Sequence, residues 1–142
     1  MLSEVTDEVA GEFGHLVPQL SRSAPALGRE ALAQVASHSA ISLLVARSGG
    51  VIVGTLTLVM FPIPTGLRAH IEDVVVDEAA RGQGVGEALS LAALALARDA
   101  GARTVDLTSR PSRAAAGRLY ERIGFVQRDS RVYRYSLDAN AD

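Results

Sequence analysis

The stretch that decides the fold is IEDVVVDEAARGQGVGEAL, residues 71–89. It contains the apolar run Val74, Val75 and Val76, which is typical of a strand at the centre of a sheet. Residues 81–86, RGQGVG, combine three glycines with one arginine. The first N–H groups of a helix lack intrahelical partners and carry the positive end of its dipole, so a glycine turn there lets several converge on phosphate oxygens. We expect a strand, a phosphate-binding turn and a helix.

Other nucleotide-binding motifs fit this stretch less well. Counting Gly-x-Gly-x-x-Gly from Gly82 places Glu87 at the last glycine position, which disfavours a Rossmann dinucleotide site. All 14 basic residues are arginine, which excludes a P-loop kinase and Schiff-base chemistry, because both need a lysine. A flexible turn that binds nothing remains the alternative interpretation of the glycines.

C-terminal to this stretch, the pattern predicts a second parallel strand. Residues 87–100 are apolar on almost every side and predict a largely buried helix closed by Gly101. Residues 103–109 then form a strand, which completes a βαβ unit. A further helix begins at Pro111 or Ser112 and stops at Gly124. Residues 125–128 and 131–137 pair as strands across residues 129 and 130.

N-terminal to the same stretch, we expect two helices and a hairpin. Thr6 caps a helix that Pro18 ends or kinks, and a second helix covers residues 25–38. Strands at 41–47 and 51–61 flank a glycine turn. Residues 62–68 read as a loop and 69–77 as a strand. The fold class is α+β, with a mixed, mainly antiparallel sheet.

Composition restricts the class of protein. The 142 residues are 48% hydrophobic and 21% charged, which predicts a single globular domain over 1–142. No apolar run approaches the roughly 20 residues of a membrane span, and the acidic start is unlike a signal peptide, so we expect a cytoplasmic protein without a membrane partner. A net charge of −2 and 4% aromatic residues disfavour nucleic acid. The sequence has no cysteine, and its histidines, including His15 and His38, show no metal-ligand spacing.

Two motifs resemble those of the Gcn5-related N-acetyltransferase (GNAT) family. The pyrophosphate loop of that family reads Gln/Arg-x-x-Gly-x-Gly/Ala and is met by Arg81, Gly84 and Gly86. RAAAGRLYERIGF, residues 113–125, is similar to the next family motif, with Arg113 where an asparagine often stands. The matching residues there are Ala116, Leu119, Tyr120, Gly124 and Phe125. The resemblance implies a GNAT-like fold with about four helices around the sheet, its first strand absent or truncated before Thr6.

The resemblance also implies acetyl-CoA as cosubstrate and no metal. In the family, the strand before the glycine loop diverges from the next parallel strand. Here its backbone at Val74 and Val76 would hydrogen-bond the pantetheine arm. Arg113, with Arg110 and Arg118, would reach the adenosine 3′-phosphate. The other residues implied to contact the cofactor are Arg81, Gly82, Gln83, Gly84, Val85, Gly86, Ser112, Ala116 and Tyr120.

The implied reaction is direct acetyl transfer to a primary amine in a ternary complex. Tyr120 matches the family tyrosine and is the candidate acid for the departing thiolate. Glu72 is the candidate base, preferred to His70; HIEDVVV is similar to the glucosamine-phosphate acetyltransferases, where a glutamate lies beside the reaction centre. Alternation puts Glu72 on one face with Val74, and Asp73 on the other. The alternative role for either acid is an ion pair with an arginine such as Arg68.

The acceptor is expected to be a small-molecule or peptide amine. The two N-terminal helices, the loop at 61–68 and the C-terminal strand with Tyr133 would recognise it. By resemblance, the C-terminal strands could also join two copies in a homodimer. The alternative function is an acyl-CoA-binding sensor or interaction module without efficient transfer.

Overall fold

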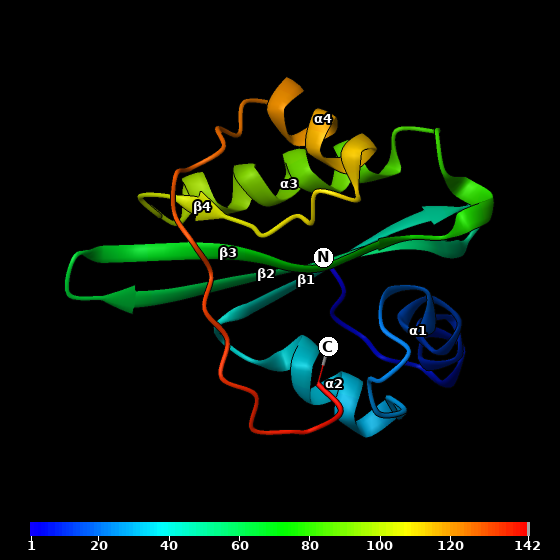
Figure 1. The fold of residues 1–142 in the computed structure, drawn as a ribbon. Coiled ribbons are helices and arrows are strands. Elements are labelled where there is room, and N and C mark those ends of the chain that lie inside the picture. Colours follow the sequence, from blue (N-terminus) through cyan, green and yellow to red (C-terminus); the bar gives the residue numbers. More distant parts are fainter. Residues whose placement is uncertain (142) are drawn as a thin grey trace.

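The computed structural model describes residues 1–141 and contains one four-stranded sheet between two layers of helices (Figure 1). The strand order is β1-β2-β3-β4, with β1 to β3 antiparallel and β4 parallel to β3. The strands are β1 Ile41–Ser48, β2 Val51–Ile63, β3 Gly66–Val76 and β4 Val105–Asp106. This arrangement confirms the predicted α+β class and the mainly antiparallel sheet.

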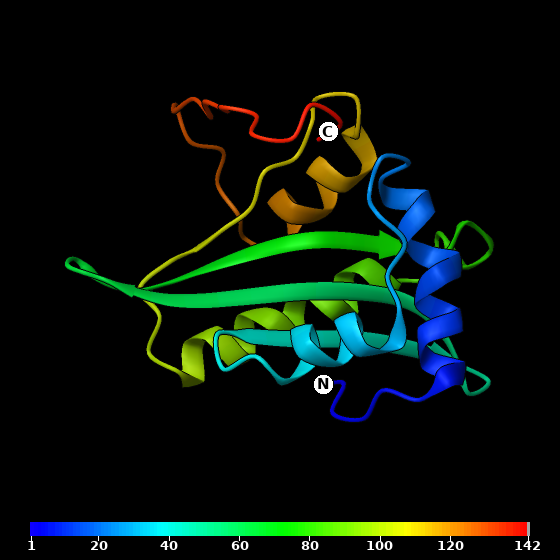
Figure 2. The same ribbon diagram turned by 90° about the horizontal axis from the view of Figure 1, so that it is seen from below.

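Four α-helices cover the sheet, two on each face (Figures 1 and 2). One face carries α1 and α2, and the other carries α3 and α4; a short 3₁₀ turn, η1, links β3 to α3. Their bounds are α1 Asp7–Leu20, α2 Arg29–Ser37, η1 Glu78–Ala80, α3 Val85–Asp99 and α4 Ala114–Arg122. The helix α2 thus begins at Arg29 and not at residue 25, and α4 begins at Ala114 and not at Pro111 or Ser112. Among the described residues, no helix is long and apolar enough to cross a membrane.

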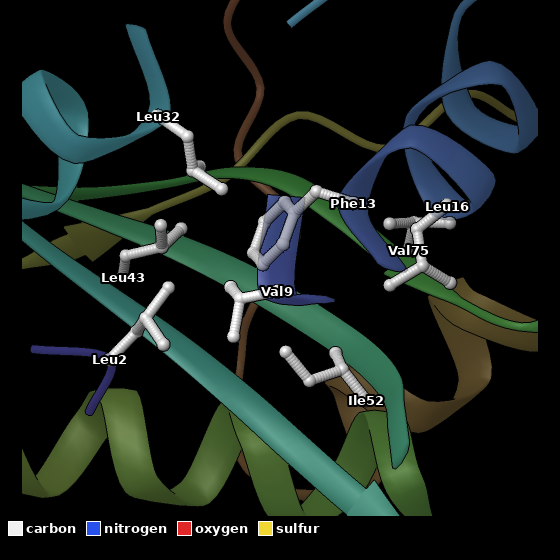
Figure 3. Close-up of a cluster of buried hydrophobic side chains, with 8 residues drawn as sticks. All are labelled: Leu2, Val9, Phe13, Leu16, Leu32, Leu43, Ile52 and Val75. Atoms are coloured by element: carbon white, nitrogen blue, oxygen red, sulfur yellow. The ribbon is translucent and has the colours of Figure 1, made fainter. Parts of the chain in front are cut away.

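The first helix, α1, packs over the hydrophobic core on one face of the sheet. The Thr6 side chain caps α1 by accepting a hydrogen bond from the backbone N–H of Val9 at 3.2 Å, as predicted. The helix continues two residues past Pro18. Its apolar stripe packs on β1, β2 and β3 together with α2 and the N-terminus (Figure 3). The buried residues of this cluster are Leu2, Val9, Phe13, Leu16, Leu32, Leu43, Ile52 and Val75.

The first strand of the family fold is absent from the described N-terminus, as predicted. Residues 1–5 form no strand. One backbone hydrogen bond joins these residues to β1, from Leu2 N–H to the Leu43 carbonyl at 2.7 Å. Within residues 1–141, no other backbone hydrogen bond connects residues 1–5 to β1.

The β1–β2 turn is confirmed, whereas the predicted loop at 62–68 is wrong. Gly49 and Gly50 both have positive φ, the conformation that this hairpin turn requires. The strands β2 and β3 stay paired as far as Ile63 and Gly66, which leaves a two-residue turn. Pro62 is accommodated because β1 pairs with β2 no further than Val59, so β2 is an edge strand there.

A bulge in β3 changes the predicted faces of that strand. Thr55 lies opposite Val75, and Thr57 opposite Glu72, so two residues of β3 stand against the single residue between these threonines. One of them, Asp73, has φ of 50°. Glu72 therefore shares the α1 face with Val75, whereas Val74 packs on the α3 side. The predicted common face of Glu72 and Val74 is wrong, because the extra residue reverses the alternation.

The third helix packs closely on β2. A Cβ at Gly54 would lie 2.7 Å from Val85 Cγ1 and 3.2 Å from Leu89 Cδ1, so only glycine allows this approach. Gly101, with φ of 83°, closes the helix as predicted. The expectation of burial on almost every side is wrong, because Leu91 is 48% exposed and only one stripe of α3 is buried.

The C-terminal strands are the largest correction. The predicted strand at 103–109 is reduced to Val105–Asp106, and the predicted pair at 125–128 and 131–137 does not form. No residue of 126–137 makes a hydrogen bond within the described chain, and its large apolar side chains are exposed. They are Val126, Val132, Tyr133, Tyr135 and Leu137. The segment lies beyond the β4 edge instead of extending it (Figure 2).

The close contact at Gly54 gives a stability prediction. We expect Gly54→Ala to lower the free energy of unfolding by about 1–3 kcal/mol, because Val85 and Leu89 must move to admit the methyl group. Urea unfolding measures it. The matched control is Gly11→Ala in α1, where a Cβ meets nothing within 4 Å; it should be neutral or stabilising by up to about 1 kcal/mol. Equal effects of the two substitutions would contradict the packing described here.

Candidate functional site

A cavity of about 570 Å³ opens between the end of β3, the turn that leads into α3, and α4. We call it the β3–α4 cavity. Its lining includes the residues predicted to contact the cofactor except Gln83, Arg110 and Arg118, which are exposed outside it. The predicted residues that line it are Val74, Val76, Arg81, Gly82, Gly84, Val85, Gly86, Ser112, Arg113, Ala116 and Tyr120.

One wall of the cavity is an open backbone edge. The parallel strand β4 pairs with β3 only at Ala69 and His70, and the chain then leaves the sheet. Within the described residues, no strand therefore lies beside β3 at 71–76 on that side. Unpaired backbone groups of a strand bond an extended ligand as a further strand would. The wall suits a ligand with amide groups along its length.

The glycine loop, residues 81–86, forms the second wall. Gly82 and Gly84 have φ of 80° and 78°, which side-chain-bearing residues rarely adopt. Gly84 is the N-cap of α3 and lines this end of the cavity with Val85 and Gly86, and the first amides of a helix have no intrahelical partners. A Cβ at Gly86 would be 3.4 Å from Leu119 Cδ2, so α4 is close as well. The loop suits an anion with several oxygens.

The charges around the loop are mixed. Arg81, Arg113 and Arg122 line the cavity, whereas Arg110 and Arg118 do not. Arg122 is not entirely available, because its Nε lies 3.8 Å from Glu87 Oε1. Two lining guanidinium groups remain without a carboxylate partner among the described residues, and both can meet phosphate.

The Tyr120 side chain reaches the cavity from α4. Its ring packs edge-on against Phe125, with the centroids 5.7 Å apart. Burial raises the pKa of the Tyr120 hydroxyl above its ordinary value, and the nearby Arg113 lowers that pKa by a smaller amount. The hydroxyl therefore keeps its proton at neutral pH and can donate it inside the cavity.

The two candidate bases lie apart from these residues. Glu72 and His70 are not part of the cavity lining, and Glu72 is exposed. The His70 ring packs against Phe61 with the centroids 5.2 Å apart. Arg68 makes no ion pair with either acid; its guanidinium donates to the hydroxyls of Thr65 and Thr104.

Sequence patterns missed several lining residues. Glu87 lies one helical turn after Gly84, and Leu119 lies one turn after Ala116, so helix periodicity could have found both. Arg122 follows Tyr120 by two residues and does not fit that spacing. Gln19 could not be found in that way, because it comes from α1 on the other side of the sheet. His15, which the sequence left without a partner, lies 3.4 Å from the Asp77 carboxylate.

Comparison with known proteins gives two relatives among characterised sequences. The chain is 36% identical to N-alpha-acetyltransferase 30 of Schizosaccharomyces pombe over 74 residues, which is 52% of this chain and about half, 49%, of that protein. It is 33% identical to glucosamine 6-phosphate N-acetyltransferase 1 of Oryza sativa subsp. japonica over 146 residues, covering 93% of this chain and 83% of that protein.

Solved structures share the fold. The glucosamine-6-phosphate N-acetyltransferase of Arabidopsis thaliana superposes with a TM-score of 0.80 at 23% identity, covering 95% of each chain, a likeness that concerns the fold alone. The sequence profile of the Acetyltransferase (GNAT) family matches residues 5–125, which include the glycine loop and Tyr120. The chain therefore belongs to the GNAT family and is an acetyltransferase.

Proposed function

We propose that this chain transfers an acetyl group directly from acetyl-CoA to a primary amine of a small molecule or peptide. The observation that carries the proposal is the meeting of three elements in one cavity: the open edge of β3, the glycine loop and Tyr120. A sensor or interaction module would need the first two but not a protonated tyrosine among them.

The residues around the β3–α4 cavity fit acetyl-CoA. The backbone at Val74 and Val76 would hold the pantetheine amides, and the first amides of α3 would hold the pyrophosphate. Arg113 would take the adenosine 3′-phosphate, without the predicted help of Arg110 and Arg118, which lie outside the lining. Bound acetyl-CoA supplies the activated thioester carbonyl.

The protein groups then handle protons. The amine nitrogen attacks the carbonyl carbon, a base takes the proton that the nitrogen loses, and the carbon–sulfur bond breaks. Tyr120 donates its proton to the leaving thiolate. The raised pKa of the Tyr120 hydroxyl keeps that proton available. A free backbone N–H of the open β3 edge, near Val74, stabilises the oxygen that becomes negative during the attack.

We assign the role of general base to Glu72, which would take the proton of the amine without touching the amine directly. Because Glu72 is exposed on the α1 face and Val74 faces α3, a direct proton transfer would require the amine to lie beyond the edge of β3. A water molecule between Glu72 and the amine is the arrangement that this separation favours.

The acceptor lies on the side of the cavity toward α1 and α2. The Oryza sativa relative is named for glucosamine 6-phosphate and the Schizosaccharomyces pombe relative for N-alpha-acetylation, so both a small amine and a peptide are retained. We place the reaction in the cytoplasm. Tyr133, whose segment is expected to help recognise the acceptor, is itself 89% exposed in a single chain.

We further propose a homodimer held together by residues 131–137. This segment reads as a strand but pairs with nothing among the described residues, and Val132 and Leu137 are 72% and 94% exposed. The chain also leaves an unpaired edge at β4. Pairing such a segment with another copy would bury its apolar side chains, which are costly to leave in water.

Gly84→Asp tests the placement of the pyrophosphate. We expect acetyl-CoA to bind at least about tenfold more weakly, because a carboxylate would enter the phosphate site, and isothermal titration calorimetry measures this. The matched control is Gly101→Asp, which adds the same charge at a similar positive φ, 83° against 78°, at the other end of α3. Similar losses in both variants would mean that backbone strain, not the phosphate, is responsible.

Tyr120→Phe tests the acid. We expect kcat to fall about 100-fold while acetyl-CoA affinity stays close to that of the wild type, because only the proton donor is removed. Thiol release over a panel of amines gives the rate, and Tyr135→Phe, which removes an exposed hydroxyl, is the control. If wild-type protein binds acetyl-CoA but releases no thiol with any amine, the sensor is the better description.

The double substitution Val132→Asp, Leu137→Asp tests the dimer. Sedimentation velocity should give a dimer for the wild type and a monomer for the variant, because buried carboxylates oppose the association. Arg128→Asp, outside the segment, controls for the added negative charge. A monomeric wild type at all concentrations would rule out this assembly.

A further inference from the structure

One side chain of α1 contacts the turn that leads into the glycine loop. Gln19 Oε1 accepts a hydrogen bond from the backbone N–H of Glu78 at 3.1 Å. Its Nε2 donates to Asp77 Oδ1 at 3.4 Å and to the His15 carbonyl at 3.2 Å. Gln19 thus uses both ends of its amide to join α1 to the first residues after β3.

Asp77 is the centre of these contacts. Its backbone N–H donates to the Val53 carbonyl at 2.7 Å, and its carboxylate accepts from the Ala79 N–H at 3.4 Å, which caps η1. His15 Nε2 lies 3.4 Å from its other oxygen. Desolvation raises the pKa of Asp77, but the hydrogen bonds from Ala79 and Gln19, with His15, outweigh it and hold that pKa below its ordinary value. The Asp77 carboxylate is therefore ionised at neutral pH and accepts the hydrogen bonds from Ala79 and Gln19.

This turn determines where the glycine loop begins. Ala80 N–H donates to the Asp77 carbonyl at 2.8 Å, and Arg81, the first residue of the loop, follows immediately. Gly82 and Gly84 have φ of 80° and 78°, and nothing lies within 4 Å of where their Cβ atoms would be. A loop with so little packing of its own depends on its ends for its position. The C-terminal end is fixed by α3, and the N-terminal end by the turn that Gln19 holds.

We propose that Gln19 is a positioning residue: its contacts with residues 77 and 78 place the glycine loop for the pyrophosphate, and so couple α1 to cofactor binding across the sheet. The proposal rests on the proposed function, because it assigns Gln19 to the same site. Gln19 also lines the β3–α4 cavity, so removing its side chain changes the site where the cofactor would bind. The packing of α1 is independent of it, since Val9, Phe13 and Leu16 anchor that helix.

The test compares three variants. Gln19→Ala removes every contact of the amide, and Gln19→Glu keeps an acceptor for Glu78 but sets a second carboxylate beside Asp77. His15→Ala removes the two contacts of the imidazole, which lies 3.4 Å from the Asp77 carboxylate and 3.3 Å from Gln19 Nε2. The matched control is Gln34→Ala in α2, an exposed glutamine whose side chain has no partner among the described residues. Acetyl-CoA affinity is measured by calorimetry, with KM, kcat and the thermal midpoint alongside.

We expect Gln19→Ala and Gln19→Glu to raise the Kd and KM for acetyl-CoA about tenfold while kcat stays within about twofold, the effect of losing two hydrogen bonds that hold the binding loop. His15→Ala should have a smaller effect, and Gln34→Ala none. A Kd unchanged from the wild type in Gln19→Ala overturns the proposal. So does a fall in kcat with no change in KM.

Amide hydrogen exchange without any ligand separates this proposal from the proposed function. In Gln19→Ala, the amides at 77–84 should exchange about tenfold faster than in the wild type, while those of α3 stay unchanged. Unchanged exchange at 77–84 refutes the positioning role even if acetyl-CoA binds. If the wild type binds no acetyl-CoA, the proposed function fails, and the exchange at 77–84 still decides whether Gln19 holds the turn.

Discussion

The site depends on the separation of β4 from β3 after two parallel residue pairs, at Ala69 and His70. A parallel strand that continued alongside β3 would satisfy its backbone and close the space. Because β4 leaves the sheet, the last residues of β3 keep free polar groups on one side, and buried free groups are costly unless a ligand meets them. The cavity, the glycine loop and α4 are all arranged around this edge.

Two further features fix the elements around that edge. The bulge at Asp73 turns Val75 toward the α1 core and Val74 toward α3, so both helical layers hold the end of β3. The absence of a side chain at Gly54 lets the start of α3 approach β2. Gln19 adds a polar connection from α1 to the turn between them. The glycine loop makes few packing contacts of its own, whereas the end of β3 and the start of α3 on either side of it are closely packed.

Much of this site could be predicted from local sequence. The glycine loop, the cap at Thr6 and the tyrosine of α4 lie where short-range spacing puts them, because helix starts and turns depend on a few neighbouring residues. The faces of β3 could not be predicted, because alternation assumes a strand without a bulge. Residues 131–137 read as a strand from their composition, but a strand needs a neighbour, and none is present in the single chain.

The sequence by itself determined the order of the helices and strands as far as α4, the family motifs and the chemistry of the cavity wall, since each depends on contacts within a few residues of chain. Only the tertiary structure decided that Glu72 faces α1, that Arg110 and Arg118 lie outside the cavity and that Gln19 lies inside it. Those facts depend on how distant segments pack. Gln19 and Asp77 are 58 residues apart along the chain, and no local pattern relates the two.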